Sequence, residues 1–309
     1  MTENNDLGET NMQQHPMDDF PVRRLDFDLS QLGENGFLWS ASSPEFSMFI
    51  NALGLDVPHF ERYLVRAMNS VKPRITNPKL RRDLVALAGQ EGHHARNFIA
   101  FNKLMAKRYP KTAKLDAASA AHFQKRAKSD TEKQLVGFTA GYETFTFLAG
   151  LVILRNYQQW LEDSNPVMKA LWVWHQVEEV EHGNVAFDVY RALYGRCEWY
   201  RKWMVLAAGW HIGWETTKAY LHMAQVEGYF KSPRRAWRAV RFLASTLAEM
   251  AWHVRPVFSR HYQPRLHPLA TTKQNPIAIA WRKHARAGGN VLEIDRAAMA
   301  QILQIENIE

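Results

Sequence analysis

Two stretches of the sequence decide the fold, GQEGHHARNF (residues 89–98) and HQVEEVEHGNVAF (residues 175–187). Each stretch holds a glutamate and a histidine three residues apart, Glu91 with His94 and Glu179 with His182. On an α-helix, residues at i and i+3 lie on the same face, one above the other. In both stretches that face also carries apolar side chains, so we expect it to point into a core, where an unpaired charge is costly. The spacing predicts two buried carboxylate–imidazole pairs on helices.

Each pair follows another predicted helix that carries a glutamate on an apolar stripe. Glu61 comes 30 residues before Glu91, and Glu143 comes 36 residues before Glu179. The repeated order Glu, Glu-x-x-His is the ligand set of ferritin-like dimetal carboxylate bundles. Hard carboxylate oxygens with one imidazole per metal suit iron or manganese better than structural zinc. We therefore expect two metal ions, iron first, with manganese or a mixed manganese–iron pair as alternatives. The predicted ligands are Glu61, Glu91, His94, Glu143, Glu179 and His182.

The rest of the chain is consistent with an all-α, ferritin-like antiparallel helix bundle with extra C-terminal helices. Strand signals are essentially missing, and prolines punctuate long apolar-striped segments. We expect an acidic flexible arm at 1–40, the dimetal bundle at 41–230, and a basic helical extension at 231–309, packed on or beside the bundle. The expected helices span 44–53, 58–71, 78–109, 115–127, 130–161, 166–194, 198–228, 232–253 and 293–304.

Composition limits the class of protein. The 309 residues contain a single cysteine, Cys197, which excludes an internal disulfide and a cysteine-based metal cluster. The first 35 residues carry eight acids and two arginines with no apolar core, so we expect no signal peptide. The most apolar helical stretch, 203–214, is too short to span a membrane, and we expect it to be buried. The expected location is the cytoplasm, with the inner face of the membrane as an alternative.

Several residues beside the ligands are candidates for supporting roles. Metal-bound histidines usually donate their second N–H to a carboxylate or carbonyl. We expect Glu178 to orient His94, and Gln90 to do the same for His182; a solvated helix face is the alternative for Glu178. His175, one turn before Glu179, is a seventh ligand, a cavity residue or an ordinary neighbour of the site. Glu178 and Tyr142 are the catalytic candidates, Tyr142 as a pocket wall or electron relay, with aromatic core packing as the simpler role.

The formal net charge of +8 is concentrated towards the C-terminus. Residues 231–286 contain 12 lysines and arginines and one acid, Glu249. Basic residues interleaved with aromatic ones are typical of a helix that lies on an anionic membrane surface. The favoured interpretation is nevertheless a helix packed on the bundle with its basic side solvated, and attachment to an anionic lipid surface is the alternative. Nucleic acid is disfavoured because no binding motif accompanies the charge. The candidate contact residues are Arg234, Arg235, Trp237 and Arg238.

Longer stretches of the sequence resemble a known family. FINALGLDVPHFERYLVRAM (49–68), GQEGHHARNFIAFN (89–102), LWVWHQVEEVEHGNVAFDVY (171–190) and YQPRLHP (262–268) are similar to the bacterial predicted metal-dependent hydrolases. The resemblance implies a ferritin-like ligand pattern and the same six ligands, each matched by its motif. The chain departs from the family pattern at Asn97, where a charged residue often stands, which leaves the outer side chains of the site open.

These observations support three functions. The leading expectation is an O₂-dependent di-iron oxidase or oxygenase that acts on a small apolar or acyl substrate with an external electron donor. The alternative is a dimetal hydrolase that uses a metal-bound water, as the resemblance implies. The second alternative is a non-catalytic iron-binding or structural protein. A homodimer is expected only by analogy with other helical bundles.

Overall fold

A computed structural model describes residues 15–32, 36–270 and 275–304. Within these residues the chain is predominantly helical and forms no β-strand, only an isolated bridge between Ser40 and Ser164. The prediction of an all-α helical bundle is confirmed. The helices are α1 (Pro44–Leu53), α2 (Val57–Val71), α3 (Pro78–Arg108), α4 (Pro110–Ser129), α5 (Glu132–Arg155), α6 (Tyr157–Trp160), α7 (Pro166–His182), α8 (Val185–Tyr194), α9 (Glu198–Val226), α10 (Pro233–His253), α11 (Pro276–Arg286) and α12 (Arg296–Gln304).

The helices that carry the site begin at well-formed caps. The side chain of Asn77 accepts hydrogen bonds from two backbone N–H groups at the start of α3, and Asn165 does the same for α7. Thr131 and Gln134 form a reciprocal capping box at the start of α5. These side chains satisfy N–H groups that have no partner inside the helix, and proline at the first position of α3 and α7 presets the backbone. The caps fix where each ligand-bearing helix starts.

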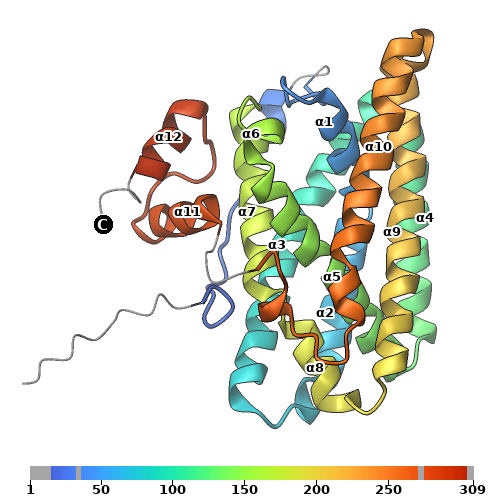
Figure 1. The fold of residues 1–309 in the computed structure, drawn as a ribbon, viewed down its shortest axis with the longest axis vertical. Coiled ribbons are helices and arrows are strands. Elements are labelled where there is room, and N and C mark those ends of the chain that lie inside the picture. The colour runs from blue at the N-terminus through green and yellow to red at the C-terminus, as the bar shows by residue number, and fades with distance from the viewer. Residues whose placement is uncertain (1–14, 33–35, 271–274, 305–309) are drawn as a thin grey trace, which may run out of the picture.

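Helix α5 is the centre of the bundle. It packs against α2, α7, α8 and α9, while α3 packs against α2 (Figure 1). By length and composition, α5 could cross a membrane, and no other helix among the described residues could. However, 83% of its most apolar window is buried inside the bundle, which identifies it as a core helix.

The segment expected as one helix over 166–194 is instead two helices, because the chain breaks after His182. Gly183 ends α7, and a Cβ atom there would lie 2.3 Å from Cδ2 of Phe147. The close approach of α5 therefore requires glycine at the break. The helix expected over 130–161 is likewise divided, since α5 ends at Arg155 and α6 begins at Tyr157.

The described part of the N-terminal segment is packed against the bundle. Phe27, Leu29, Phe37 and Trp39 are buried, and the indole N–H of Trp39 donates to Asn51 Oδ1 at 2.9 Å. For these residues the expectation of a flexible arm is wrong, because the acids in the segment conceal an apolar series that covers the core. Residues 1–14 and 33–35 lie outside the described residues.

The C-terminal extension divides into two parts. Helix α10 lies along the bundle beside α9, and α11 and α12 lie on the other side, near α7 (Figure 1). The backbone N–H of Ile294 donates to Pro166 O at 3.2 Å, which ties the segment before α12 to the start of α7. The sequence pattern does not predict α11, whose Trp281 is nevertheless fully buried. Both parts contact the bundle.

Candidate metal centre

Four helices of the bundle aim acids and histidines at one point in the interior. The side chains come from α2 (Glu61), α3 (Glu91 and His94), α5 (Glu143) and α7 (His175, Glu179 and His182). None of these seven residues is more than 3% exposed. The i, i+3 and i, i+4 spacings on α3 and α7 place the members of each set on one helix face, as the sequence predicts for the repeated motif.

One half of the cluster is built around His94. Its Nδ1 lies 3.6 Å from an oxygen of each of three carboxylates, those of Glu61, Glu91 and Glu179. His175 joins the same group, with Nε2 3.5 Å from Glu61 Oε1 and 3.2 Å from Glu179 Oε1. Burial lowers the pKa of His175 to about 3, so its ring is neutral. The position of His175 is that of a ligand candidate rather than of an outer neighbour.

The other half is built around His182. Its Nε2 lies 3.1 Å from Glu91 Oε1, 3.4 Å from Glu143 Oε2 and 3.3 Å from Glu179 Oε2. Glu91 and Glu179 therefore take part in both halves, with one oxygen facing His94 and the other facing His182. Carboxylates so placed could contribute to both of two metal sites. The centre is asymmetric, with two histidines in the first half and one in the second.

The donor atoms fit metal ions. Oxygen and nitrogen ligands bind such ions at about 2.0–2.2 Å, so donors around one ion are about 3.0–3.5 Å apart. The closest imidazole–carboxylate separations in both halves, 3.1–3.6 Å, are near that range, and all the donor atoms of each half lie within 4.8 Å of one another. Buried polar atoms normally have hydrogen-bond partners. Here both oxygens of Glu61, one each of Glu91 and Glu143, and a ring nitrogen each of His94 and His175 have none. Two divalent cations would use these atoms and balance the four carboxylates.

The protonation of the metal-free centre also indicates that cations would balance its buried carboxylates. Burial raises the pKa of the Glu61 and Glu143 carboxyls well above their usual range. Burial also opposes ionisation of Glu91, but the imidazolium rings of His182 and His94 hold its pKa at about 2. The neighbouring carboxylates outweigh the effect of burial on both rings and raise their pKa. Protons thus compensate buried carboxylate charge where cations would do so in the loaded protein.

The outer nitrogen of each central histidine has a partner on the opposite helix. His94 Nε2 lies 3.0 Å from Glu178 Oε2, and His182 Nδ1 lies 2.9 Å from Gln90 Oε1. These are the pairs expected from the sequence, and the orienting role assigned to Glu178 and Gln90 stays a prediction. In both contacts the other ring nitrogen faces the carboxylates, as expected for a metal-bound histidine.

The sequence pattern does not reveal Arg23 and Glu181. Arg23 Nη1 lies 2.8 Å from Glu178 Oε1 and 2.7 Å from Glu181 Oε2, and Nη2 lies 2.9 Å from Glu181 Oε1. Gln90 also donates to Glu181 Oε2 at 3.2 Å. One signal was available: α7 places three acids within four residues on a fully buried helix, so a cation from elsewhere had to balance them. Nothing local in the sequence identifies that cation as Arg23.

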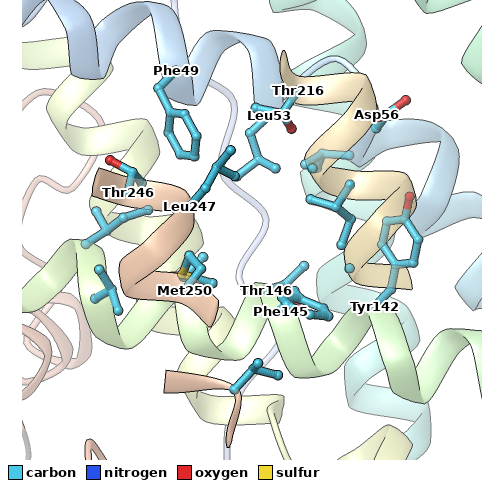
Figure 2. Close-up of a pocket in the computed structure, with 18 of the residues that line it drawn as sticks. Phe49, Leu53, Asp56, Tyr142, Phe145, Thr146, Thr216, Thr246, Leu247 and Met250 are labelled. Carbon is cyan, nitrogen blue, oxygen red and sulfur yellow. The ribbon is translucent and has the colours of Figure 1, made fainter. Parts of the chain in front are cut away.

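A cavity of about 380 Å³ adjoins the centre. Apolar side chains from α1, α5, α9 and α10 form most of its wall, and Phe49, Leu53, Leu247 and Met250 project towards it (Figure 2). His175, a member of the first half of the centre, also lines the cavity and connects the two spaces. The polar residues of the wall are Asp56, Tyr142, Thr146, His175, Gln176, Thr216 and Thr246.

Tyr142 lines this cavity and does not belong to either half of the centre. Its hydroxyl hydrogen-bonds Nδ1 of His211, and its ring stacks on Phe60 with centroids 4.1 Å apart. His211 in turn stacks on His122, with centroids 4.4 Å apart. Tyr142 is therefore a wall residue with a fixed hydroxyl, and its catalytic role stays a prediction.

The basic residues expected at an anionic surface lie on the outer side of α10. Arg234 and Trp237 are exposed, Arg235 extends over the Tyr229 ring at 4.4 Å, and Arg238 pairs with Glu45 at 2.9 Å. A membrane contact through these residues stays a prediction.

The chain matches one family of known proteins over most of its length. The model of a family described as "Predicted metal-dependent hydrolase" matches residues 21–271. No curated protein and no solved structure matches the chain.

Proposed function

Since the chain belongs to the family of predicted metal-dependent hydrolases, we propose that it is a dimetal hydrolase that cleaves an ester, amide or phosphate bond next to an apolar chain. One observation carries the proposal: the apolar cavity extends to His175, whose Nε2 lies 3.2 Å from a bridging carboxylate. An apolar chain would occupy the cavity and leave its polar end at the centre.

The expectation of an O₂-dependent di-iron oxidase is wrong. The family that covers most of the chain is described by metal-dependent hydrolysis, which matches the alternative considered from the sequence. The repeated Glu, Glu-x-x-His order misled the prediction because a ligand set defines a metal pair but not the reaction that the pair supports. A hydrolase, unlike an oxidase, requires no external electron donor.

The donor set identifies which residues would hold the metals. Glu61, His94, His175 and Glu179 would hold one ion, and Glu91, Glu143, Glu179 and His182 would hold the other. Glu91 also approaches His94 of the first half, so both Glu91 and Glu179 could contribute to the two sites. Four carboxylates with three imidazoles suit iron(II) or manganese(II). Such a pair, when bound, polarises a substrate oxygen and lowers the pKa of water in the site.

The remaining residues position the substrate and the ligands. Thr146 lines the cavity, and its hydroxyl lies 3.4 Å from Glu143 Oε1, so it would contact the polar end of a bound chain. The Tyr142 hydroxyl, held by His211, would lie along the same wall. Glu178 is fully buried behind His94 and paired with Arg23, so we assign it a positioning role instead of a catalytic one. The apolar wall would exclude bulk water from the bond that is cleaved.

A chain-length series tests the proposal. Protein loaded with iron(II) or manganese(II) would be given p-nitrophenyl acetate, butyrate, octanoate and laurate, followed by amides and phosphate monoesters of the preferred chain. We expect kcat/KM to rise with chain length until the cavity is filled, and Glu179→Gln to abolish turnover. If protein with two metals per chain hydrolyses none of the three bond types, the proposal is refuted.

A further inference from the structure

The exposed tryptophans gather on two adjacent helices. All 11 tryptophans of the chain lie among the described residues, and five are buried in the core. The other six are more than half exposed, four of them on α9 and two on α10. The exposed ones are Trp199, Trp203, Trp210, Trp214, Trp237 and Trp252. The expectation that 203–214 is buried is therefore wrong for the tryptophan side of this segment: Met204, Val205 and Ala208 are buried, whereas its three tryptophans are exposed.

The four tryptophans of α9 form a single stripe with Leu206. Their spacing follows the helical repeat, and Trp199 to Trp214 covers about 22 Å at 1.5 Å per residue. The rings stack in pairs, with Trp199 parallel to Trp203 and Trp210 parallel to Trp214. Large apolar side chains exposed in a continuous patch mark a surface that contacts another apolar phase. Trp is also the residue type that accumulates at membrane–water interfaces.

The cavity opens beside this stripe. Leu206 and Trp210 line the cavity and are 55% and 74% exposed, and exposed Ala251 lines it from α10. Gly209 and Gly213 of α9 also belong to the cavity wall. A Cβ atom at Gly213 would meet nothing within 4 Å, so this position is open space. An apolar chain can therefore enter between α9 and α10 at the surface that carries the tryptophans.

The charge around the tryptophan stripe indicates what kind of partner this surface binds. The exposed side of α10 carries Arg234, Arg235 and Arg241, and Glu249 is the single acid of that helix. On α9, Glu215 pairs with Lys218 at 2.7 Å and is therefore balanced. A second copy of this chain would bring like charges together, which is destabilising. An anionic lipid surface would be attracted by about 1 kcal/mol for each basic residue near it.

We propose that the tryptophan-bearing face of α9 and α10 docks on an anionic lipid bilayer, and that an acylated amphiphile passes from that bilayer into the cavity. The tryptophans insert at the level of the head groups, and the arginines of α10 contact the lipid phosphates. The substrate of the centre is then a lipid-derived acyl compound. The identity of this substrate rests on the proposed hydrolase function, whereas the docking of the face on a bilayer does not.

Vesicle flotation tests the docking. The full chain would be mixed with vesicles of phosphatidylcholine alone or with phosphatidylglycerol added, at low and high salt. We expect flotation with the anionic vesicles and weaker binding at high salt. Trp210→Ser with Trp214→Ser should weaken binding at least about tenfold, and Arg234→Gln with Arg241→Gln about thirtyfold. Val85→Ser, which removes an exposed apolar side chain from α3, is the matched control and should leave binding unchanged.

Quenching of tryptophan fluorescence provides a readout that needs no variant. Lipids brominated on their acyl chains quench only rings that enter the bilayer, and six exposed rings should give a large signal. Absence of both flotation and quenching overturns the proposal. It is also overturned if sedimentation shows a dimer that the two tryptophan substitutions dissociate, because the face would then belong to a second copy. Vesicle binding by Glu179→Gln separates the two proposals, since docking should persist where hydrolysis is lost.

Discussion

Replacing Arg23 by methionine would leave two carboxylates uncompensated beside the metal centre. The guanidinium contacts Glu178 and Glu181 through three hydrogen bonds of 2.7–2.9 Å. The side chains of Glu178 and Glu181 are 0% and 2% exposed, and that of Arg23 is 10% exposed. Water therefore cannot replace the missing cation. Removing one partner from such a buried ion pair typically costs about 3–5 kcal/mol of unfolding free energy.

That cost can be converted into a melting temperature. At about 2.1 cal/mol/K per residue, the unfolding entropy of this chain corresponds to a shift of about 1.5 °C for each kcal/mol. Arg23→Met should therefore lower Tm by about 5–8 °C. Arg23→Lys keeps the charge but loses the planar two-pronged contact, so it should lower Tm by less. Because we assign Glu178 the role of orienting His94, we expect Arg23→Met also to weaken metal binding about 10–100-fold.

Calorimetry of metal-free protein and metal titration of the same samples would measure the two effects. Arg24→Met is the matched control, because Arg24 is exposed on the same segment and should tolerate the change. If Arg23→Met melted as the wild type does and bound metal equally well, the contribution of the N-terminal segment to the centre would be refuted.

Three further predictions follow from the site. His175→Ala should remove one metal of the two, or weaken it selectively, because His175 belongs to the first half alone; equal loss of both ions would contradict the assignment. Gly213→Leu should narrow the mouth of the cavity and reduce kcat/KM for laurate esters more than for acetate esters, with Gly213→Ala as control; an equal effect on both would contradict entry at this point. In metal-free protein, the raised pKa values of Glu61 and Glu143 mean that the folded state holds protons which the unfolded state releases above the ordinary value of 4.5. The unfolding free energy of the metal-free protein should therefore fall as the pH rises above about 4.5. Calorimetry at several pH values would measure this, and a melting temperature that rises over the same range would contradict it.

The centre was predictable because its signal is local. A glutamate and a histidine three residues apart on an apolar stripe define their own geometry, and the repetition of the motif predicts two pairs. The association of Glu178 with His94 also followed from the chemistry of metal-bound imidazole, which requires a partner for the second nitrogen. In these cases helix periodicity alone relates the sequence to the position in space.

The features that the sequence did not predict depend on contacts between distant segments. Arg23 meets Glu178 from 155 residues away, and no pattern near either residue predicts that contact. The break after His182 depends on the close approach of Phe147 to Gly183, which is a property of packing rather than of propensity. The tryptophans of α9 follow one helix face, and Met204, Val205 and Ala208 follow another, so the sequence indicates two apolar faces without identifying the one that is covered. Only the assembled bundle resolves that choice.

The most direct test is the metal content of protein purified from its native host. Elemental analysis should find two transition-metal ions per chain, iron or manganese, because the cluster has two halves that Glu91 and Glu179 both contact. Glu91→Ala and Glu179→Ala should each lose metal, since either substitution removes a donor from both halves. Full metal occupancy in both variants, or wild-type protein that binds no metal, would contradict the assignment of this cluster as a dimetal centre.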